Sequence, residues 1–281
     1  AFEVDGVQFL YALSAQQQAD QPIEMGAAAY TKTNYGGIVY GKTAAMFAYL
    51  AAYLGEESFE KCMKSYFRQW HFKHPYPSDI RRVFETESGK NLAWFFEDGI
   101  QTTQKIDFKL TRASINKDAV KARIQSRTNF TGPAPVSVLN GDSIIETRWI
   151  EYPYREPITF NQSDRKITRV SIDAEEKLPE IKINNNDYSK TGMLHKVKIR
   201  PRLGTTLGLN RYHDLYFLPA VAYNYYDKAM AGVVIHNLKI PNHKFQFAFT
   251  PLYSFGTQQI TGTGVIGYSF FPEKLRKITI A

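Results

Sequence analysis

Apolar positions along the chain follow three patterns, and the first, up to about residue 110, has the three-to-four-residue spacing of helices. The strongest predicted helix covers residues 42–54 and is apolar on nearly all sides, so we expect it to be buried. Gly55 follows it as a C-terminal cap. Further helices are predicted at residues 58–70, from residue 78 onward, and at 91–100. The first part of the chain is therefore predicted to be helical.

From about residue 117 the pattern changes to a period of two, which predicts strands. Val120, Ala122 and Ile124 alternate with Lys121 and Arg123. Further short strands, separated by turn-forming residues, are predicted at 136–138, 144–149, 158–160 and 170–172. Several short strands with such turns predict a small β-sandwich.

After Lys190 the predicted strands are longer. They cover residues 194–203, 215–226, 229–238, 245–255 and 261–271. Strands of about ten residues with aromatic side chains near their ends are typical of a transmembrane barrel wall, although periodicity alone favours a soluble antiparallel sheet. A membrane wall would have one continuously apolar face, and the row Lys196, Lys198 and Arg200 would face a polar interior or the headgroup boundary.

The predicted fold class is therefore multidomain, α then β. Residues 1–112 form a helical part, residues 113–188 a small β-sandwich, and residues 189–281 an antiparallel long-stranded sheet or partial β-barrel. An outer-membrane barrel needs about eight strands or more, so the five or six expected here would make an incomplete one.

The net charge of +8 lies almost entirely in the last part of the chain. From Lys190 onward there are 12 Lys and Arg against three acids, which leaves −1 for the residues before it. No compact basic cluster and no nucleic-acid motif accompany this charge, so no nucleic-acid partner is expected. The single cysteine, Cys62, excludes an intramolecular disulfide framework.

Residues that could carry chemistry are few. His71 and His74 have a spacing that could place both on one helix face, but the predicted helix ends there, so polar residues of a turn are the simpler interpretation. Cys62 falls on the inward face of its helix, as expected for an inert core thiol. No His-Glu-x-x-His and no Gly-x-Ser-x-Gly occurs. Tyr40 remains, and by composition alone it is a half-buried aromatic residue at a helix start.

The sequence around Tyr40 resembles the segment of M1-family zinc aminopeptidases that follows their zinc-binding helices. Those enzymes usually have Tyr-x-Lys-Gly here, and this chain has Thr43 at the glycine position. The resemblance rests on Tyr40-Gly41-Lys42-Thr43, Leu54-Gly55, Phe59 and Tyr66-Phe67, with Asp20-Gln21-Pro22-Ile23 and Trp94-Phe95-Phe96-Glu97-Asp98 in support. The resemblance is strong over residues 20–110 and weaker over residues 190–281. It is to a bacterial branch of the family in which a β-sandwich follows the helices and some members continue into an outer-membrane-type barrel.

The resemblance implies that Tyr40 is the catalytic tyrosine whose hydroxyl stabilises the tetrahedral intermediate. It also implies a zinc ion whose ligands lie outside this chain, before residue 1, so that these 281 residues alone would be inactive. The implied partners are a peptide substrate, the remaining N-terminal part of the same protein and, if the last segment is a barrel wall, outer-membrane lipid. The implied location is the bacterial cell envelope, at the outer membrane. The alternative is a non-catalytic envelope binding or assembly module derived from a peptidase.

Overall fold

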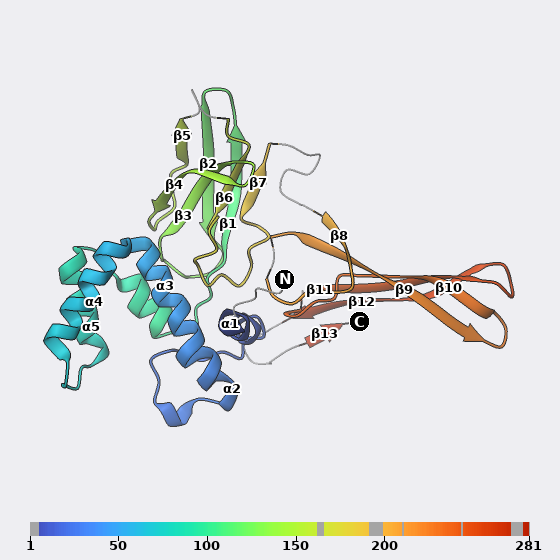
Figure 1. The fold of residues 1–281 in the computed structure, drawn as a ribbon, viewed down its shortest axis with the longest axis horizontal. Helices are drawn as coiled ribbons and strands as arrows, with labels where there is room; N and C mark the ends of the chain where they lie inside the picture. The colour runs from blue at the N-terminus through green and yellow to red at the C-terminus, as the bar shows by residue number, and fades with distance from the viewer. Residues whose placement is uncertain are drawn as a thin grey trace.

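The computed structural model describes residues 6–161, 166–190, 199–209, 211–242, 244–270 and 278–280. Its helices all precede its strands, as Figure 1 shows. The helical elements are α1 (Gly6–Gln16), η1 (Ala27–Ala29), α2 (Lys32–Asn34), η2 (Tyr35–Lys42), α3 (Thr43–Leu54), α4 (Glu56–Trp70), α5 (Pro77–Ser88) and η3 (Trp94–Ile100). None of the helices in these ranges has the length and apolar character needed to cross a bilayer.

The predicted buried helix is confirmed as α3, and Gly55 ends it with a φ of 82°, a conformation that favours glycine. The short helix predicted at residues 91–100 is a π-helix, η3, over residues 94–100. A second π-helix, η2, covers residues 35–42, where the sequence analysis predicted no helix before residue 42. Fully buried Tyr49 on α3 donates to the Pro133 carbonyl oxygen of the following sheet region. Helices and sheets therefore share one interior.

Two small antiparallel sheets follow the helices and lie above them in Figure 1. The first has the order β1-β2-β5 and the second β4-β3-β6-β7. Their strands are β1 (Phe108–Ile115), β2 (Ala119–Ser126), β3 (Ala134–Asn140), β4 (Ser143–Ile150), β5 (Ile158–Asn161), β6 (Arg169–Ile172) and β7 (Asp187–Ser189). Strand β1 was not expected and runs across the predicted division at residue 112. The division of the chain into three parts stays a prediction.

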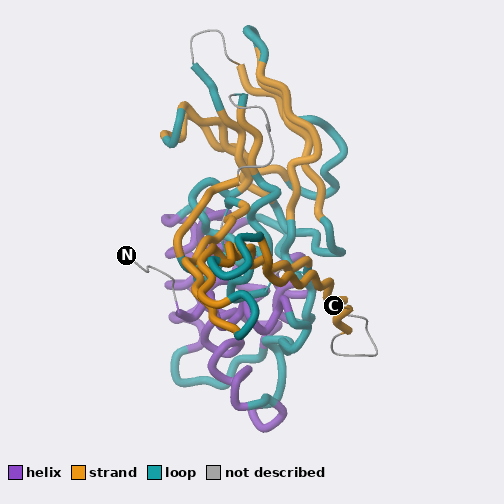
Figure 2. The backbone as a smooth tube through the Cα atoms, turned by 90° about the vertical axis from the view of Figure 1, so that its right-hand side faces the viewer, coloured by secondary structure: helices purple, strands orange, loops and turns teal. Residues whose placement is uncertain are grey.

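Both small sheets belong to the same core as the helices. The buried cluster joins Leu50 and Phe95 of the helical part to Phe108 and Val136 of the two sheets. Figure 2 shows the helices gathered on one side of these sheets. Burial of apolar surface stabilises a fold by about 25 cal/mol per Å². Because the helical part and the two small sheets bury their apolar side chains against each other, we expect them to fold together.

The last sheet is larger and projects from the rest of the molecule (Figure 1). Its order is β13-β12-β11-β10-β9-β8, and within the described residues no pairing closes it into a barrel. Its strands are β8 (Ile199–Leu203), β9 (His213–Asn224), β10 (Lys228–His236), β11 (Phe245–Ser254), β12 (Ile260–Phe270) and β13 (Ile278–Ile280).

One pairing in this sheet corrects the prediction of a wholly antiparallel segment. Strand β8 pairs in parallel with β9, with Ile199 opposite His213 and Leu203 opposite Phe217. The connection between the two strands brings the chain back to the end where β8 began, and the Gly204 amide donates to the Phe217 carbonyl on the way. The predicted start of β8 at residue 194, with Lys196 and Lys198, lies outside the described residues.

Candidate functional site

Tyr40 lies in the π-helix η2, directly before the buried helix α3. Its side chain is 62% exposed, in contrast to the half-buried position that composition suggests. Within the described part of the chain, no group hydrogen-bonds to its hydroxyl. A phenol is both a donor and an acceptor, so this hydroxyl can donate to an external group. π-Helical turns are rare and occur frequently at functional sites.

The ring of Tyr40 is held in a row of three tyrosines. It makes an edge-to-face contact with Tyr35, with ring centroids 6.0 Å apart, and Tyr35 contacts Tyr30 in the same way at 6.3 Å. The Tyr30 hydroxyl is anchored, because it lies 2.9 Å from the Pro22 carbonyl oxygen and 2.6 Å from that of Ile23. Such aromatic pairs contribute about 0.5–1.5 kcal/mol each beyond area burial. The row therefore positions the exposed Tyr40 ring from the end that Tyr30 anchors.

The backbone of η2 is fixed at both ends. At its start, the Asn34 side-chain amide donates to the Ala19 carbonyl oxygen at 2.7 Å and to Gln21 Oε1 at 3.0 Å. At its end, the Thr43 amide and the Thr43 hydroxyl both donate to the Ile38 carbonyl oxygen, the hydroxyl at 3.2 Å. Thr43, where the M1 pattern has glycine, therefore supplies an extra hydrogen bond to the π-helical turn.

Lys42, two residues after Tyr40, is buried with only 1% of its surface exposed. Its ammonium donates to the Thr102 carbonyl oxygen at 2.9 Å and lies 6.0 Å from the centre of the Tyr11 ring. Burial lowers the Lys42 pKa from 10.5 to about 8, although the nearby Asp20 carboxylate opposes the shift. Asp20 itself accepts from Lys105. The sequence pattern does not predict this cluster of buried charges, apart from the presence of a lysine at the start of an apolar stretch.

We expect the stability of the protein to rise with pH through Lys42. Between about pH 8 and pH 10.5 the unfolded chain holds a proton that folded Lys42 has released, so the free energy of unfolding increases with pH. The full shift corresponds to at most about 3 kcal/mol. Urea unfolding at several pH values in this window would measure the rise in the wild type, in Lys42→Met and in Lys32→Met, whose lysine is exposed.

Only Lys42→Met should lack this part of the rise. An identical rise in all three proteins would contradict the assignment to Lys42.

The other sequence candidates are not brought to this place. Helix α4 ends at Trp70, and His71 and His74 follow it as exposed residues of a turn, as the simpler interpretation predicted. Cys62 is a fully buried free thiol, and burial raises its pKa, which confirms an inert core residue. Among the residues that the structure describes, no group of three His, Cys, Asp or Glu side chains could hold a metal ion.

A pocket of about 460 Å³ lies elsewhere, on β1 and β2, away from η2. Arg112, Lys121, Arg123 and Pro157 are among the residues that line it. None of these residues belongs to the elements that position Tyr40, so the exposed surface of η2 is the better candidate for an active site.

Comparisons with known proteins point to one class of enzyme for this part of the chain. Residues 5–98 match the model of the Peptidase family M1 domain, and this range contains η2 with Tyr40. The N-terminal third of the chain is therefore similar to M1-family peptidases, and the matched range ends before β1, the first strand of the sheets.

The relatives found are aminopeptidases. The chain is 27% identical over 156 residues to "Probable aminopeptidase 2" of Sulfurisphaera tokodaii, covering 53% of this chain and 18% of that protein. It is 33% identical over 86 residues to "Aminopeptidase N" of Streptomyces lividans, covering 31% of this chain and 10% of that protein. Legionella pneumophila aminopeptidase A, solved in complex with aspartic acid, aligns with 16% identity and a TM-score of 0.39 over 55% of this chain and 18% of its own. The chain thus spans less than a fifth of the length of each of these proteins.

Proposed function

We propose that this chain is part of an M1-type zinc aminopeptidase and that Tyr40 is its catalytic tyrosine. The observation that carries the proposal is the position of Tyr40: it lies inside the M1-matched range, and its exposed hydroxyl has no partner among the described residues. A phenol aimed at the developing oxyanion of a tetrahedral intermediate stabilises the transition state more than the substrate, by about 3 kcal/mol.

The described residues do not fit a zinc site, because they contain no metal-binding cluster. We therefore assign no step to the metal. In the proposed enzyme the zinc is bound by residues outside those described, which the remaining N-terminal part of the protein is predicted to provide. This chain contributes the oxyanion donor Tyr40 and the helical elements that hold it in place.

The non-catalytic alternative, an envelope binding or assembly module, gains no support from a relative, since the two curated relatives reported above are both named as aminopeptidases. The outer-membrane location stays a prediction from the sequence. It depends on the last sheet and not on the peptidase-like part.

The proposed function can be tested with a pair of peptides that differ only at the amino terminus. The polypeptide that contains these residues, supplied with zinc, should release residues one at a time from a peptide with a free amino group. It should leave the N-acetylated peptide of the same sequence intact. Equal cleavage of both peptides would indicate an endopeptidase, and no cleavage of either would remove the peptidase proposal.

A further inference from the structure

The strand pairing of the last sheet sorts its residues into two unlike faces. Residues paired across neighbouring strands share a face, and residues alternate between faces along a strand. Because the registers of β8 to β13 contain no shift, each strand contributes alternate residues to each face along its whole length. The pairings therefore determine which residues of the six strands lie on the same face of the sheet.

One face, which we call the apolar face, contains no Asp, Glu, Lys or Arg in any of the six strands. Histidine occurs on it once, at the start of β9. Its larger side chains are Ile199, Leu203, Leu215, Phe217, Val221, Tyr223, Val233, Ile235, Phe245, Phe247, Phe249, Tyr253, Ile260, Ile266, Tyr268, Phe270, Ile278 and Ile280.

The opposite face, which we call the polar face, carries the charged residues of these strands and many small ones. They include Arg200, Arg202, Asp214, Asn224, Lys228, His236, Gln246, Thr250, Ser254, Thr261, Thr263, Ser269 and Thr279. Arg200 donates to Asp214 at 2.9 Å on this face. Of the row Lys196, Lys198 and Arg200, which the sequence analysis expected to face a polar interior or the headgroup boundary, Arg200 is the one residue that the structure describes.

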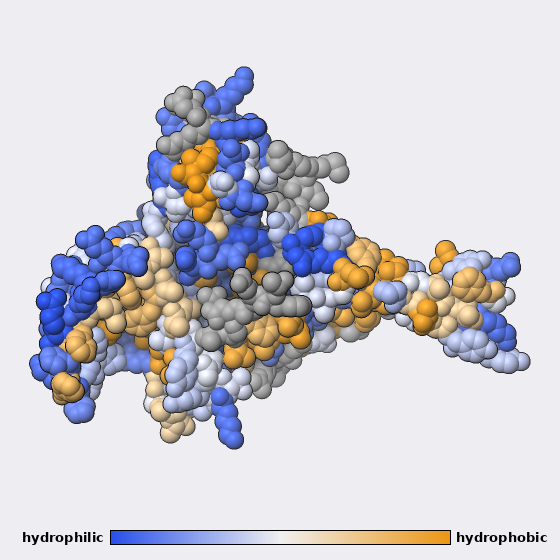
Figure 3. Space-filling view, viewed as in Figure 1, coloured by the Kyte–Doolittle hydropathy of each residue, from blue (hydrophilic) through white to orange (hydrophobic). Residues whose placement is uncertain are grey.

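Burial in this sheet is the reverse of that in a soluble protein. The residues of its strands that are buried all lie on the polar face, namely Asp214, Tyr216, Met230, His236, Ser254 and Ser269. No residue of the apolar face is buried: its side chains are exposed or half-buried, with Val221 at 86% and Ile260 at 81% exposed. In Figure 3 hydrophobic residues gather along the projecting sheet, whereas hydrophilic residues cover much of the helices and small sheets. An exposed apolar surface of this extent marks an interaction site.

The apolar face has the dimensions and the aromatic distribution of a surface in contact with lipid. The ten residues of β11 extend about 34 Å, and at a tilt of about 45° they span about 24 Å, which matches the apolar band of about 25 Å in membrane barrels. The tyrosines of the face lie near its two ends, Tyr223 and Tyr253 by the outer turns and Tyr268 by the rest of the molecule. Tyrosine prefers the membrane–water interface because its ring is apolar and its hydroxyl is wet.

We propose that the apolar face of β8–β13 lies against the hydrocarbon region of a lipid bilayer, with the polar face turned away from lipid. The proposal does not depend on the peptidase activity. A protein partner would be expected to meet charged groups at the rim of such a surface, whereas the six strands present no charged residue on this face, and its polar groups are the tyrosine hydroxyls and His213 near its ends. Among the described residues β8 and β13 are edge strands, and in a bilayer their free edges must pair with further strands.

Val233 and Val234 allow a matched test, because they are adjacent valines of one strand on opposite faces. Replacing Cys62, the single cysteine, with alanine leaves a background in which Val233→Cys or Val234→Cys carries one fluorescent label. The full chain is reconstituted into vesicles of phosphatidylcholine and phosphatidylglycerol, with or without brominated acyl chains. The label at residue 233 should be quenched by the brominated lipid, and the label at residue 234 should be quenched much less.

A second measurement does not depend on labelling. An arginine near the bilayer midplane on the lipid face should lower the vesicle partition coefficient of Val233→Arg by about 30-fold or more. Val234→Arg should bind vesicles nearly as well as the wild type. Equal quenching at the two positions, or a wild-type chain that stays monomeric in buffer and does not float with vesicles, would overturn the proposal. So would a detergent-free dimer in which labels at residue 233 of two copies are close together, since a second copy would then cover the face.

Discussion

Replacing Tyr40 with phenylalanine should lower kcat of the complete peptidase by about 100-fold or more. The substitution removes one hydroxyl and keeps the ring, so the edge-to-face contact with Tyr35 and the π-helical turn should persist. Because the proposed hydrogen bond forms to the oxyanion, kcat and kcat/KM should fall together while KM changes little. Steady-state kinetics with an aminoacyl substrate, and the zinc content of each preparation, would measure this.

Tyr35→Phe is the matched control for this experiment. Tyr35 is also exposed, lies in the same π-helix and contacts the same ring, but in the proposed enzyme its hydroxyl does not donate to the oxyanion. We expect it to keep kcat within about a factor of three of the wild type, as for a surface change away from special features. An unchanged kcat in Tyr40→Phe would remove Tyr40 from the mechanism. A loss of zinc together with activity would indicate a structural effect instead.

The periodic parts of the chain were predictable because one repeated interaction determines each of them. The helix of residues 43–54 is apolar on most sides and could only be buried, and Gly55 was recognisable as its cap. The strands from β9 to β12 alternate so regularly that their limits were found to within about two residues. For these elements, local pattern and global packing agree.

The site was harder to predict because it depends on tertiary contacts. The π-helix of residues 35–42 is held by Asn34 reaching the Ala19 carbonyl, by Gln21, and by burial of Ile38 against Tyr11. No pattern of apolar positions signals such an arrangement. The burial of Lys42 was missed for the same reason, since a lysine in a helix is normally assigned to the surface. Only the resemblance to a known family directed attention to Tyr40.

The two faces of the last sheet could not be predicted from the sequence for a different reason. Alternation within each strand was visible in the sequence, but which residues of neighbouring strands share a face depends on register. A shift of one residue in any pairing would have mixed apolar and polar positions. The parallel pairing of β8 was not expected, because neighbouring strands in a run of this kind are usually joined as antiparallel hairpins. The structure thus supplied the step from alternating strands to an amphipathic sheet.

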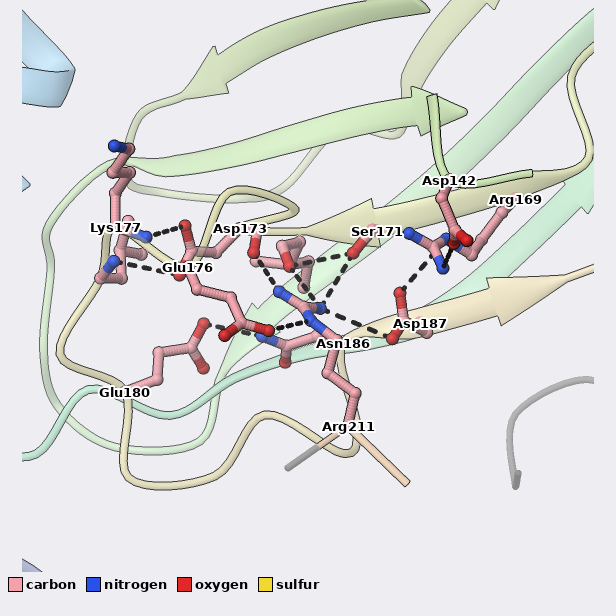
Figure 4. A network of polar contacts seen from close by, with 12 residues as sticks. Asp142, Arg169, Ser171, Asp173, Glu176, Lys177, Glu180, Asn186, Asp187 and Arg211 are labelled. Atoms are coloured by element: carbon pink, nitrogen blue, oxygen red, sulfur yellow. Dashed lines mark hydrogen bonds and ion pairs between the residues drawn. The ribbon is translucent and has the colours of Figure 1, made fainter. Parts of the chain in front are cut away.

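Arg211 joins this sheet to the rest of the molecule, and its removal should be the most destabilising single change among the polar residues (Figure 4). It lies just before β9 and is directed at the end of β6 and at β7. Its guanidinium donates to Glu176 at 2.8 Å, to the Ser171 hydroxyl at 3.0 Å and to Asp187 at 3.5 Å. It also donates to the backbone carbonyl oxygens of Ile172 and Asp173.

Arg211→Met should lower the free energy of unfolding by about 3 kcal/mol, because it leaves buried carboxylate and carbonyl groups without their donor. Urea unfolding in one buffer would measure this, with Arg82→Met as the control. Arg82 pairs with Asp79 at 2.9 Å, but its side chain is 66% exposed, so its loss should cost less than about 1 kcal/mol. Equal effects of the two substitutions would contradict the role assigned to Arg211.

The effect of Arg211→Met should also depend on pH. Burial raises the pKa of Asp173 to about 6, and the charge of Arg211 limits that rise. Without Arg211 the ionised carboxylate is stabilised less, so the loss of stability should be larger at pH 7.5 than at pH 4.5, where Asp173 is protonated in the folded protein. Arg211→Lys should recover only part of the stability at either pH, because an ammonium cannot donate in one plane to two carbonyl oxygens and two carboxylates at once. Full recovery by lysine would mean that charge alone, and not the geometry of the guanidinium, joins the projecting sheet to the small sheets.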